Sequence, residues 1–167
     1  MKTKLIYSIT ALSLLFIPFI SWGQVKVTSE TSEIFENQEA LSDFFRLEGI
    51  EYQKLVLTSK ELQNKTYQLS VKEIWDGIIT KDSLIVDSKV LPDFVKTVGD
   101  TIFTMRVISK FAENKLKMDF IFPQFSTKRE FDATFLDKHS PYSLRKVVGT
   151  ETVEFDKKFY LMVYMLP

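Results

Sequence analysis

Cysteine is absent from this chain of 167 residues, and its absence removes several functional classes at once. Without a thiol there is no thiol nucleophile, no thiolate zinc site, and no lipid-modified cysteine of the kind that tethers a bacterial lipoprotein. Disulfides are excluded too. A domain of this length must therefore be held together by its apolar core.

Histidine and glycine are nearly as scarce. The single histidine, His139, has an aspartate and a serine close by in sequence, but no serine lies in a nucleophile-elbow sequence. One histidine cannot share a metal site with a second one. The five glycines are isolated, so the chain has no glycine-rich phosphate loop, and it has no Asp-rich calcium loop. We therefore expect no catalytic residue of these classes, no metal and no cofactor.

An excess of either charge is also missing. The chain carries 22 basic and 22 acidic residues, and the two signs alternate along nearly its whole length. A nucleic-acid-binding protein needs a basic face that can neutralise phosphates. The sequence therefore argues against a nucleic-acid partner.

The first informative feature that is present is the N-terminus. Lys2 and Lys4 precede an apolar run from Leu5 to Ile20, and Ser21-Trp22-Gly23 forms a small-x-small cleavage site. The run is interrupted by polar residues and is shorter than the roughly 20 residues that span a bilayer. The sequence thus predicts a cleavable signal peptide over residues 1–23, with no transmembrane segment after its removal. We expect a periplasmic or secreted protein, and the lack of cysteine favours a bacterial envelope.

The composition of the remaining residues, 24–167, predicts one domain that is mainly β with a minor α component. Alanine is scarce, whereas Phe, Val, Ile, Thr and Tyr are plentiful. A polar stretch over 24–31 is expected to be mobile, and a helix is expected from about residue 32 to Leu47, with Gly49 as its stop signal. Two arrangements fit: an antiparallel β-sandwich, or a sheet covered by this N-terminal helix.

Residues 67–86 give the clearest strand pattern. Apolar and polar residues alternate up to Trp75, and Asp76-Gly77 follows at once. Asp-Gly is a strong signal for a two-residue hairpin loop, because both positions require a positive φ. We expect Trp75 to pair with Ile78, with a bulge near residues 81–83, where the alternation breaks.

Two further hairpins are predicted. Alternating apolar residues over 103–111 and 116–122 indicate two strands joined at residues 113–115, followed by a bend at Pro123. Residues 153–155 and 159–166 suggest a last hairpin whose final strand is apolar on both faces and therefore central in a sheet. Four phenylalanines in phase with apolar neighbours are expected in the core: Phe103, Phe120, Phe122 and Phe159.

The candidate ligand-binding residues are Trp75, Tyr67 and Glu73. The two aromatic residues flank polar positions on a hairpin whose tip can project from the sheet, and exposed rings stack on sugars or bury in a protein partner. Glu73 is expected on the apolar face beside Trp75, where it is either a functional carboxylate or a partly solvated residue paired with a lysine.

By elimination, the sequence favours an exported, non-enzymatic binding module that recognises an envelope protein or a glycan through a sheet face or hairpin tips. This hypothesis predicts a contiguous exposed apolar or aromatic patch. A small carboxylate-dependent hydrolase predicts instead a concave site with two acids of different proton affinity. A carrier of apolar ligands predicts an internal pocket lined by Phe and Met.

Overall fold

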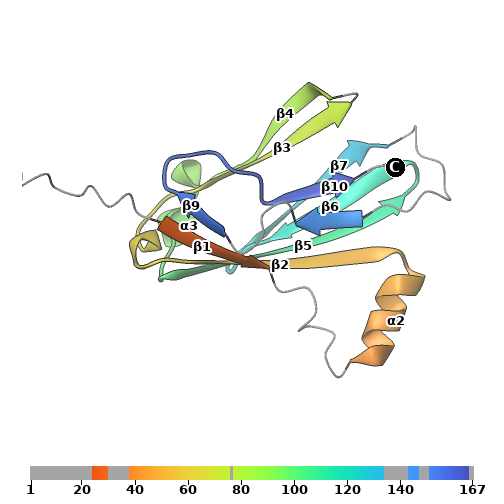
Figure 1. Cartoon of the computed structure of the whole chain (residues 1–167), viewed down its shortest axis with the longest axis horizontal. Coiled ribbons are helices and arrows are strands. Elements are labelled where there is room, and N and C mark those ends of the chain that lie inside the picture. Colours follow the sequence, from red (N-terminus) through yellow and green to blue (C-terminus); the bar gives the residue numbers. More distant parts are fainter. Residues whose placement is uncertain (1–23, 30–37, 76, 134–142, 147–150, 166–167) are drawn as a thin grey trace, which may run out of the picture.

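The structure is a computed structural model that describes residues 24–29, 38–75, 77–133, 143–146 and 151–165. It is mainly β with a few short helical elements, and all its strand pairs are antiparallel, which confirms the predicted fold class. The largest element is a curled sheet of six strands (Figure 1). In sheet order these are β7 (Ser126–Asp132), β6 (Lys115–Ile121), β5 (Ile102–Ala112), β2 (Ile50–Thr58), β1 (Gln24–Ser29) and β9 (Glu151–Glu154).

Two separate two-stranded ribbons form the second layer. One pairs β3 (Gln68–Trp75) with β4 (Ile78–Asp87), and the other pairs β8 (Ser143–Lys146) with β10 (Met162–Met165). Both contribute apolar side chains to the core that covers the inner face of the six-stranded sheet. The arrangement is therefore that of strands packed on a sheet.

The core follows directly from the alternation of apolar residues. On β5 and β6, every second residue is buried, including Met105, Val107, Met118 and Phe120. Leu55 on β2 is fully buried beside them. Because successive side chains of a strand point to opposite faces, this one pattern fixes which face of the sheet lies inward.

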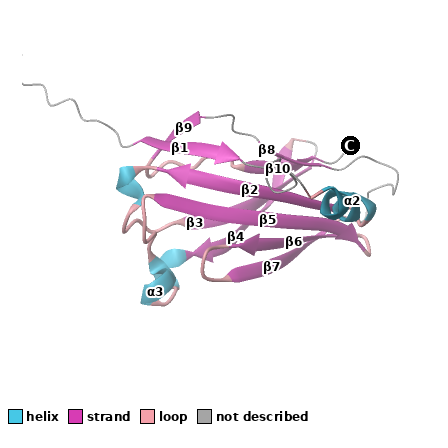
Figure 2. Ribbon diagram, turned by 90° about the horizontal axis from the view of Figure 1, so that it is seen from below, coloured by secondary structure: helices cyan, strands magenta, loops and turns pink. Residues whose placement is uncertain are grey.

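The N-terminal helix does not cover the sheet, so the second predicted arrangement is wrong. Helix α2 (Glu39–Leu47) has no buried residue: Leu41, Phe44 and Leu47 are exposed, and Phe45 is half-buried. Figure 2 shows α2 at one end of the sheet. The helix ends before Gly49, as predicted, and that glycine has the left-handed φ of +61° that stops a helix. Residues 32–37 of the predicted helix lie outside the described part.

Three short helical turns connect the strands: η1 (Lys60–Leu62), η2 (Ser88–Val90) and α3 (Asp93–Lys96). The last two follow β4, and α3 lies at the end of the sheet opposite to α2 (Figure 2).

The hairpin of β5 and β6 is confirmed. Ala112 pairs with Lys115, and the turn residues Glu113 and Asn114 both have a positive φ. This is the conformation that a two-residue hairpin loop requires. Strand β6 ends at Ile121, just before the bend at Pro123, and β7 then continues the sheet.

The prediction of a C-terminal hairpin is wrong. Strand β9 pairs with β1 at the edge of the six-stranded sheet, whereas β10 pairs with β8. Phe159, expected in the core, is 37% exposed. At the other end of the chain, Gln24–Ser29 forms β1 between β2 and β9, which differs from the mobile stretch expected there. Hydrogen bonding on both sides orders this polar segment, and sequence polarity does not reveal such pairing.

The turn of the β3–β4 ribbon can be tested with alanine substitutions. Gly77 has a φ of +77°, and an added Cβ there meets no atom within 4 Å, so any penalty comes from the backbone alone. We expect Gly77→Ala to lower the free energy of unfolding by about 1 kcal/mol in chemical denaturation. Gly99 has equally open surroundings without a positive φ. Gly99→Ala should therefore cost nothing, and equal behaviour of the two variants would contradict the turn.

Candidate functional site

The β3–β4 ribbon is an exposed part of the fold that carries apolar residues near its turn. Its base is fixed to the core through Leu69, Val71 and Val86. At the same end, Tyr67 N–H donates to Ser88 Oγ at 2.8 Å, and Ser88 N–H donates to the Tyr67 carbonyl. Towards its turn the ribbon rises away from the six-stranded sheet (Figure 1). Within the described residues, no third strand pairs with it.

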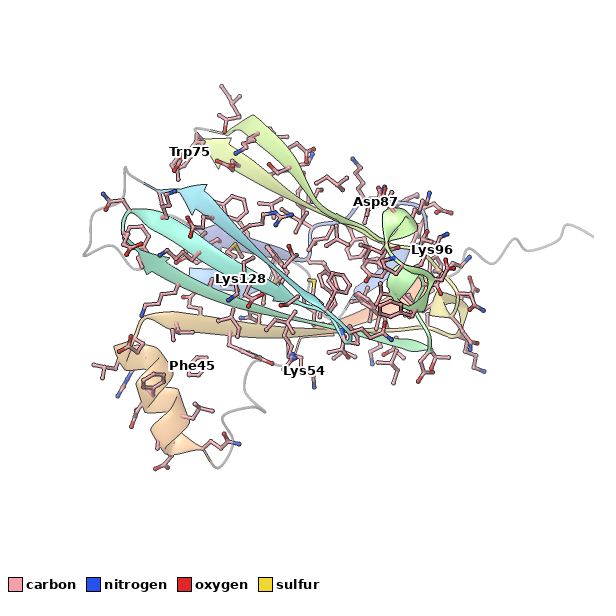
Figure 3. All side chains as sticks on the ribbon, turned by 180° about the vertical axis from the view of Figure 1, so that it is seen from behind. Phe45, Lys54, Trp75, Asp87, Lys96 and Lys128 are labelled. Carbon is pink, nitrogen blue, oxygen red and sulfur yellow. The ribbon has the colours of Figure 1, made fainter. Side chains whose placement is uncertain are left out.

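The end of the ribbon is apolar on both faces. Trp75 pairs with Ile78 on the inner face, and Ile74 pairs with Ile79 on the outer face. The exposed fractions of Ile74, Ile78 and Ile79 are 50%, 67% and 49%. Trp75 is half-buried and lies at the end of the ribbon in Figure 3. We call these four residues the apolar tip.

Two ion pairs follow the apolar tip, one on each face. On the inner face Lys81 Nζ lies 3.4 Å from Glu73 Oε1, and on the outer face Lys72 Nζ lies 3.5 Å from Asp82 Oδ2. Below them the outer face continues with Ser70 opposite Leu84. The ribbon is therefore apolar for its last two residue pairs and charged immediately beneath them.

The register of the ribbon explains this arrangement. Trp75 pairs with Ile78 as predicted, but β4 contains two bulges, at Thr80 and Ile85, each of which has no partner in β3. The bulge at Thr80, next to the predicted position, brings Lys81 rather than Thr80 opposite Glu73. A bulge adds one residue to a strand, so it changes which face the following side chains occupy.

Glu73 is paired with a lysine, which is one of the alternatives that the sequence left open. Its side chain is 18% exposed and has Lys81 as its charged partner. Its Oε1 atom is buried and makes no hydrogen bond of good geometry. A catalytic pair of carboxylates needs a second acid beside the first, whereas the charged group beside Glu73 is the ammonium group of Lys81.

Tyr67 lies at the opposite end of the ribbon from Trp75. Its ring packs 4.7 Å from that of Phe103 and 5.6 Å from that of Phe122, measured between centroids. Burial raises the pKa of its hydroxyl group. The three predicted site residues therefore do not converge: Trp75 and Glu73 share the inner face of the ribbon near its tip, and Tyr67 belongs to an aromatic cluster at its base.

A groove of about 270 Å³ opens beside α2, away from the ribbon. It is lined by Ser42, Phe45, Arg46, Ile50, Glu51, Tyr52, Gln53 and Leu144. Its lining contains one phenylalanine, no methionine and a single acid. It is therefore neither the Phe- and Met-lined pocket of a carrier nor a site with two carboxylates.

Two polar residues beside this groove hold β8 in place. The Leu144 N–H donates to the Glu51 carboxylate, and Gln53 Nε2 donates to the Leu144 carbonyl at 3.3 Å. Gln53 and Leu144 are both buried. Sequence reasoning missed this clamp, although two long polar side chains at alternate positions before Leu55 and Leu57, on the inner face of β2, were a visible signal.

The described residues also bear on two other kinds of structure, a metal site and a membrane-spanning helix. No three His, Asp or Glu side chains there are grouped so that they could hold a metal ion. In that same part of the chain, no helix is long and apolar enough to cross a membrane. His139 lies outside it.

No protein-family model, no curated protein and no solved structure matches this chain.

Proposed function

We propose that this chain is an exported, non-enzymatic binding module that recognises a protein of the cell envelope through the apolar tip of the β3–β4 ribbon. The observation that carries this proposal is the exposure of Ile74, Ile78 and Ile79 at one place on both faces of the ribbon. Single exposed apolar residues are ordinary, but a contiguous group at a projecting end is typical of a surface that becomes buried in a complex.

A protein partner fits this tip better than a glycan does. Sugars are recognised by stacking on flat aromatic rings, and the exposed residues of the tip are branched aliphatic side chains. Burial of an isoleucine side chain in an apolar pocket makes the free energy of binding more favourable, by about 1.5–3 kcal/mol when burial is complete. The ion pairs of Glu73 with Lys81 and of Lys72 with Asp82 would then lie at the rim of the interface, where polar residues are common.

The two alternative functions have weaker support. A hydrolase with two carboxylates would use Glu73, whose charged partner is Lys81. A carrier would need an enclosed pocket lined by Phe and Met, which the groove beside α2 does not provide. Neither alternative makes use of the exposed tip.

Binding to envelope proteins tests the proposal. We expect Ile78→Asp to reduce capture of a specific partner from a solubilised envelope fraction by about tenfold or more, because a carboxylate would enter an apolar pocket unpaired. Val90 is the matched control, since it is 80% exposed but lies in η2, away from the tip. Val90→Asp should leave capture unchanged. If both variants capture every partner as the wild type does, the tip is not the recognition surface.

A further inference from the structure

The outer face of the β3–β4 ribbon carries a second pattern, which extends beyond the apolar tip towards the base of the ribbon. Three of its exposed residues are apolar: Ile74, Ile79 and Leu84, which are 50%, 49% and 57% exposed. Between Ile79 and Leu84 lies the Lys72–Asp82 ion pair. Figures 1 and 3 show no described element on the side of the ribbon that faces away from the sheet.

Three of the four residue pairs across the outer face join chemically compatible partners, and the fourth joins a polar residue to an apolar one. From the turn downwards, Ile74 lies opposite Ile79, Lys72 opposite Asp82, Ser70 opposite Leu84, and Gln68 opposite Asp87. In the last pair, Gln68 Nε2 donates to Asp87 Oδ2 at 2.9 Å. The face is therefore complementary to itself when it is turned about the long axis of the ribbon.

We propose that this outer face binds the same face of a second copy of the chain, around a two-fold axis parallel to the ribbon. Such an axis places β3 of one copy over β4 of the other. Lys72 then lies over Asp82 of the second copy, and Ile74 lies over Ile79 of the second copy. The two ion pairs become an alternating square of four charges, which is favourable as a network even where a single exposed pair contributes little.

Charge complementarity selects this arrangement over the others. A two-fold axis across the strands would place Lys72 over Lys72 of the second copy and Asp82 over Asp82, so that like charges meet. Pairing of β4 edge to edge is opposed by the bulges at Thr80 and Ile85, which interrupt the ladder of backbone hydrogen bonds.

The size of the face sets the expected affinity. A ribbon of eight residue pairs is about 25 Å long and about 10 Å wide, so it buries less than the roughly 800 Å² per partner of a standard interface. We therefore expect a weak dimer, with a dissociation constant of about 0.1 mM.

Two charge reversals test the proposal with the protein alone. Lys72→Glu places acids over acids in its homodimer, and Asp82→Lys places cations over cations. Either substitution should raise the dissociation constant about tenfold or more in sedimentation velocity, at concentrations from about one-tenth to about ten times the wild-type value.

Mixing the two variants should restore the dimer. In an equimolar mixture, the new carboxylate of the Lys72→Glu variant meets the new ammonium group of the Asp82→Lys variant. At the other corner of the interface, the unchanged Asp82 of the first variant meets the unchanged Lys72 of the second. The mixture should therefore dimerise within about threefold of the wild type.

This rescue distinguishes an interface from a structural role. Within each variant the ribbon keeps its own like-charge pair whether or not the other variant is present, so damage to folding cannot be repaired by mixing. The matched control is the cross-strand pair of Lys115 and Glu130, whose charged atoms are 3.4 Å apart between β6 and β7. Lys115→Glu, Glu130→Lys and their mixture should all dimerise as the wild type does.

Three outcomes would overturn the inference: a wild type that stays monomeric over the whole range, charge reversals without effect, or a mixture no better than its components. The inference is also separable from the proposed function. Leu84→Asp should weaken the dimer and leave capture of an envelope partner unchanged. Ile78→Asp, on the inner face, should do the opposite.

Discussion

Replacement of Phe122 by alanine should lower the free energy of unfolding by about 3–5 kcal/mol. The ring is 3% exposed and stacks on Phe125 at 4.6 Å between centroids, with Tyr67 and Phe103 at 5.6 and 6.2 Å. Its removal leaves a cavity that three other rings cannot fill without leaving their own contacts. Because Phe122 follows the last residue of β6, the sheet register is unaffected, and urea denaturation would report the lost packing alone.

A surface phenylalanine provides the control for this result. Phe94 in α3 is 73% exposed, so Phe94→Ala should change the free energy of unfolding by no more than about 0.5 kcal/mol. If Phe122→Ala does not fold, Phe122→Leu keeps most of the buried volume and should show a smaller loss of about 1–2 kcal/mol. A loss at Phe122 as small as that at Phe94 would mean that the aromatic cluster does not form.

This cluster also shows what the sequence predicts well. Phe103, Phe120 and Phe122 could be assigned to the core because they are in phase with other apolar residues along two segments joined by a short turn. Local alternation fixes which face is buried, and a turn of two residues fixes which strands pair. The hairpins of β3 with β4 and of β5 with β6 were therefore predictable from residues close in sequence.

Pairing between distant segments was not predictable in this way. Strand β1 lies between β2 and β9, although β9 follows it by more than a hundred residues. The predicted last hairpin gave priority to the short distance between β9 and β10, and tertiary packing overrode it. Phe159 lies between these two strands, which belong to different layers, and it is partly exposed there rather than in the core.

The candidate site was predicted in part. The Asp76-Gly77 signal located the turn, and the alternation located Trp75 beside it. The isoleucines of the tip were not singled out, because exposure of an apolar residue depends on whether another layer covers it. The broken alternation predicted a bulge near residues 81–83, but it gave neither the exact position at Thr80 nor the second bulge at Ile85, and both decide which residues face outward.

Removal of the clamp that Glu51 and Gln53 form on β8 should have the second large effect on the free energy of unfolding. Glu51 accepts from the Leu144 N–H and Gln53 donates to the Leu144 carbonyl, so loss of either leaves a buried backbone group without that partner. We expect Glu51→Ala and Gln53→Ala each to lower the free energy of unfolding by about 1–3 kcal/mol in urea denaturation. Glu51→Gln keeps an acceptor oxygen and should recover much of that loss. Glu48→Ala, which removes an exposed ion pair with Lys110, should cost no more than about 1 kcal/mol.

The double variant decides whether the two side chains act as one clamp. Both hold the same residue, so once one contact is lost, Leu144 can shift and weaken the other. Glu51→Ala combined with Gln53→Ala should therefore cost less than the sum of the single losses, by about 0.5 kcal/mol or more. Hydrogen exchange should speed up at β8 and β10 in this variant, while the β3–β4 ribbon keeps its protection, because the two ribbons share no strand pairing. Strictly additive losses would instead mean that the two side chains act independently. A β3–β4 ribbon that exchanges faster together with β8 would mean that the two halves of the second layer unfold as one unit.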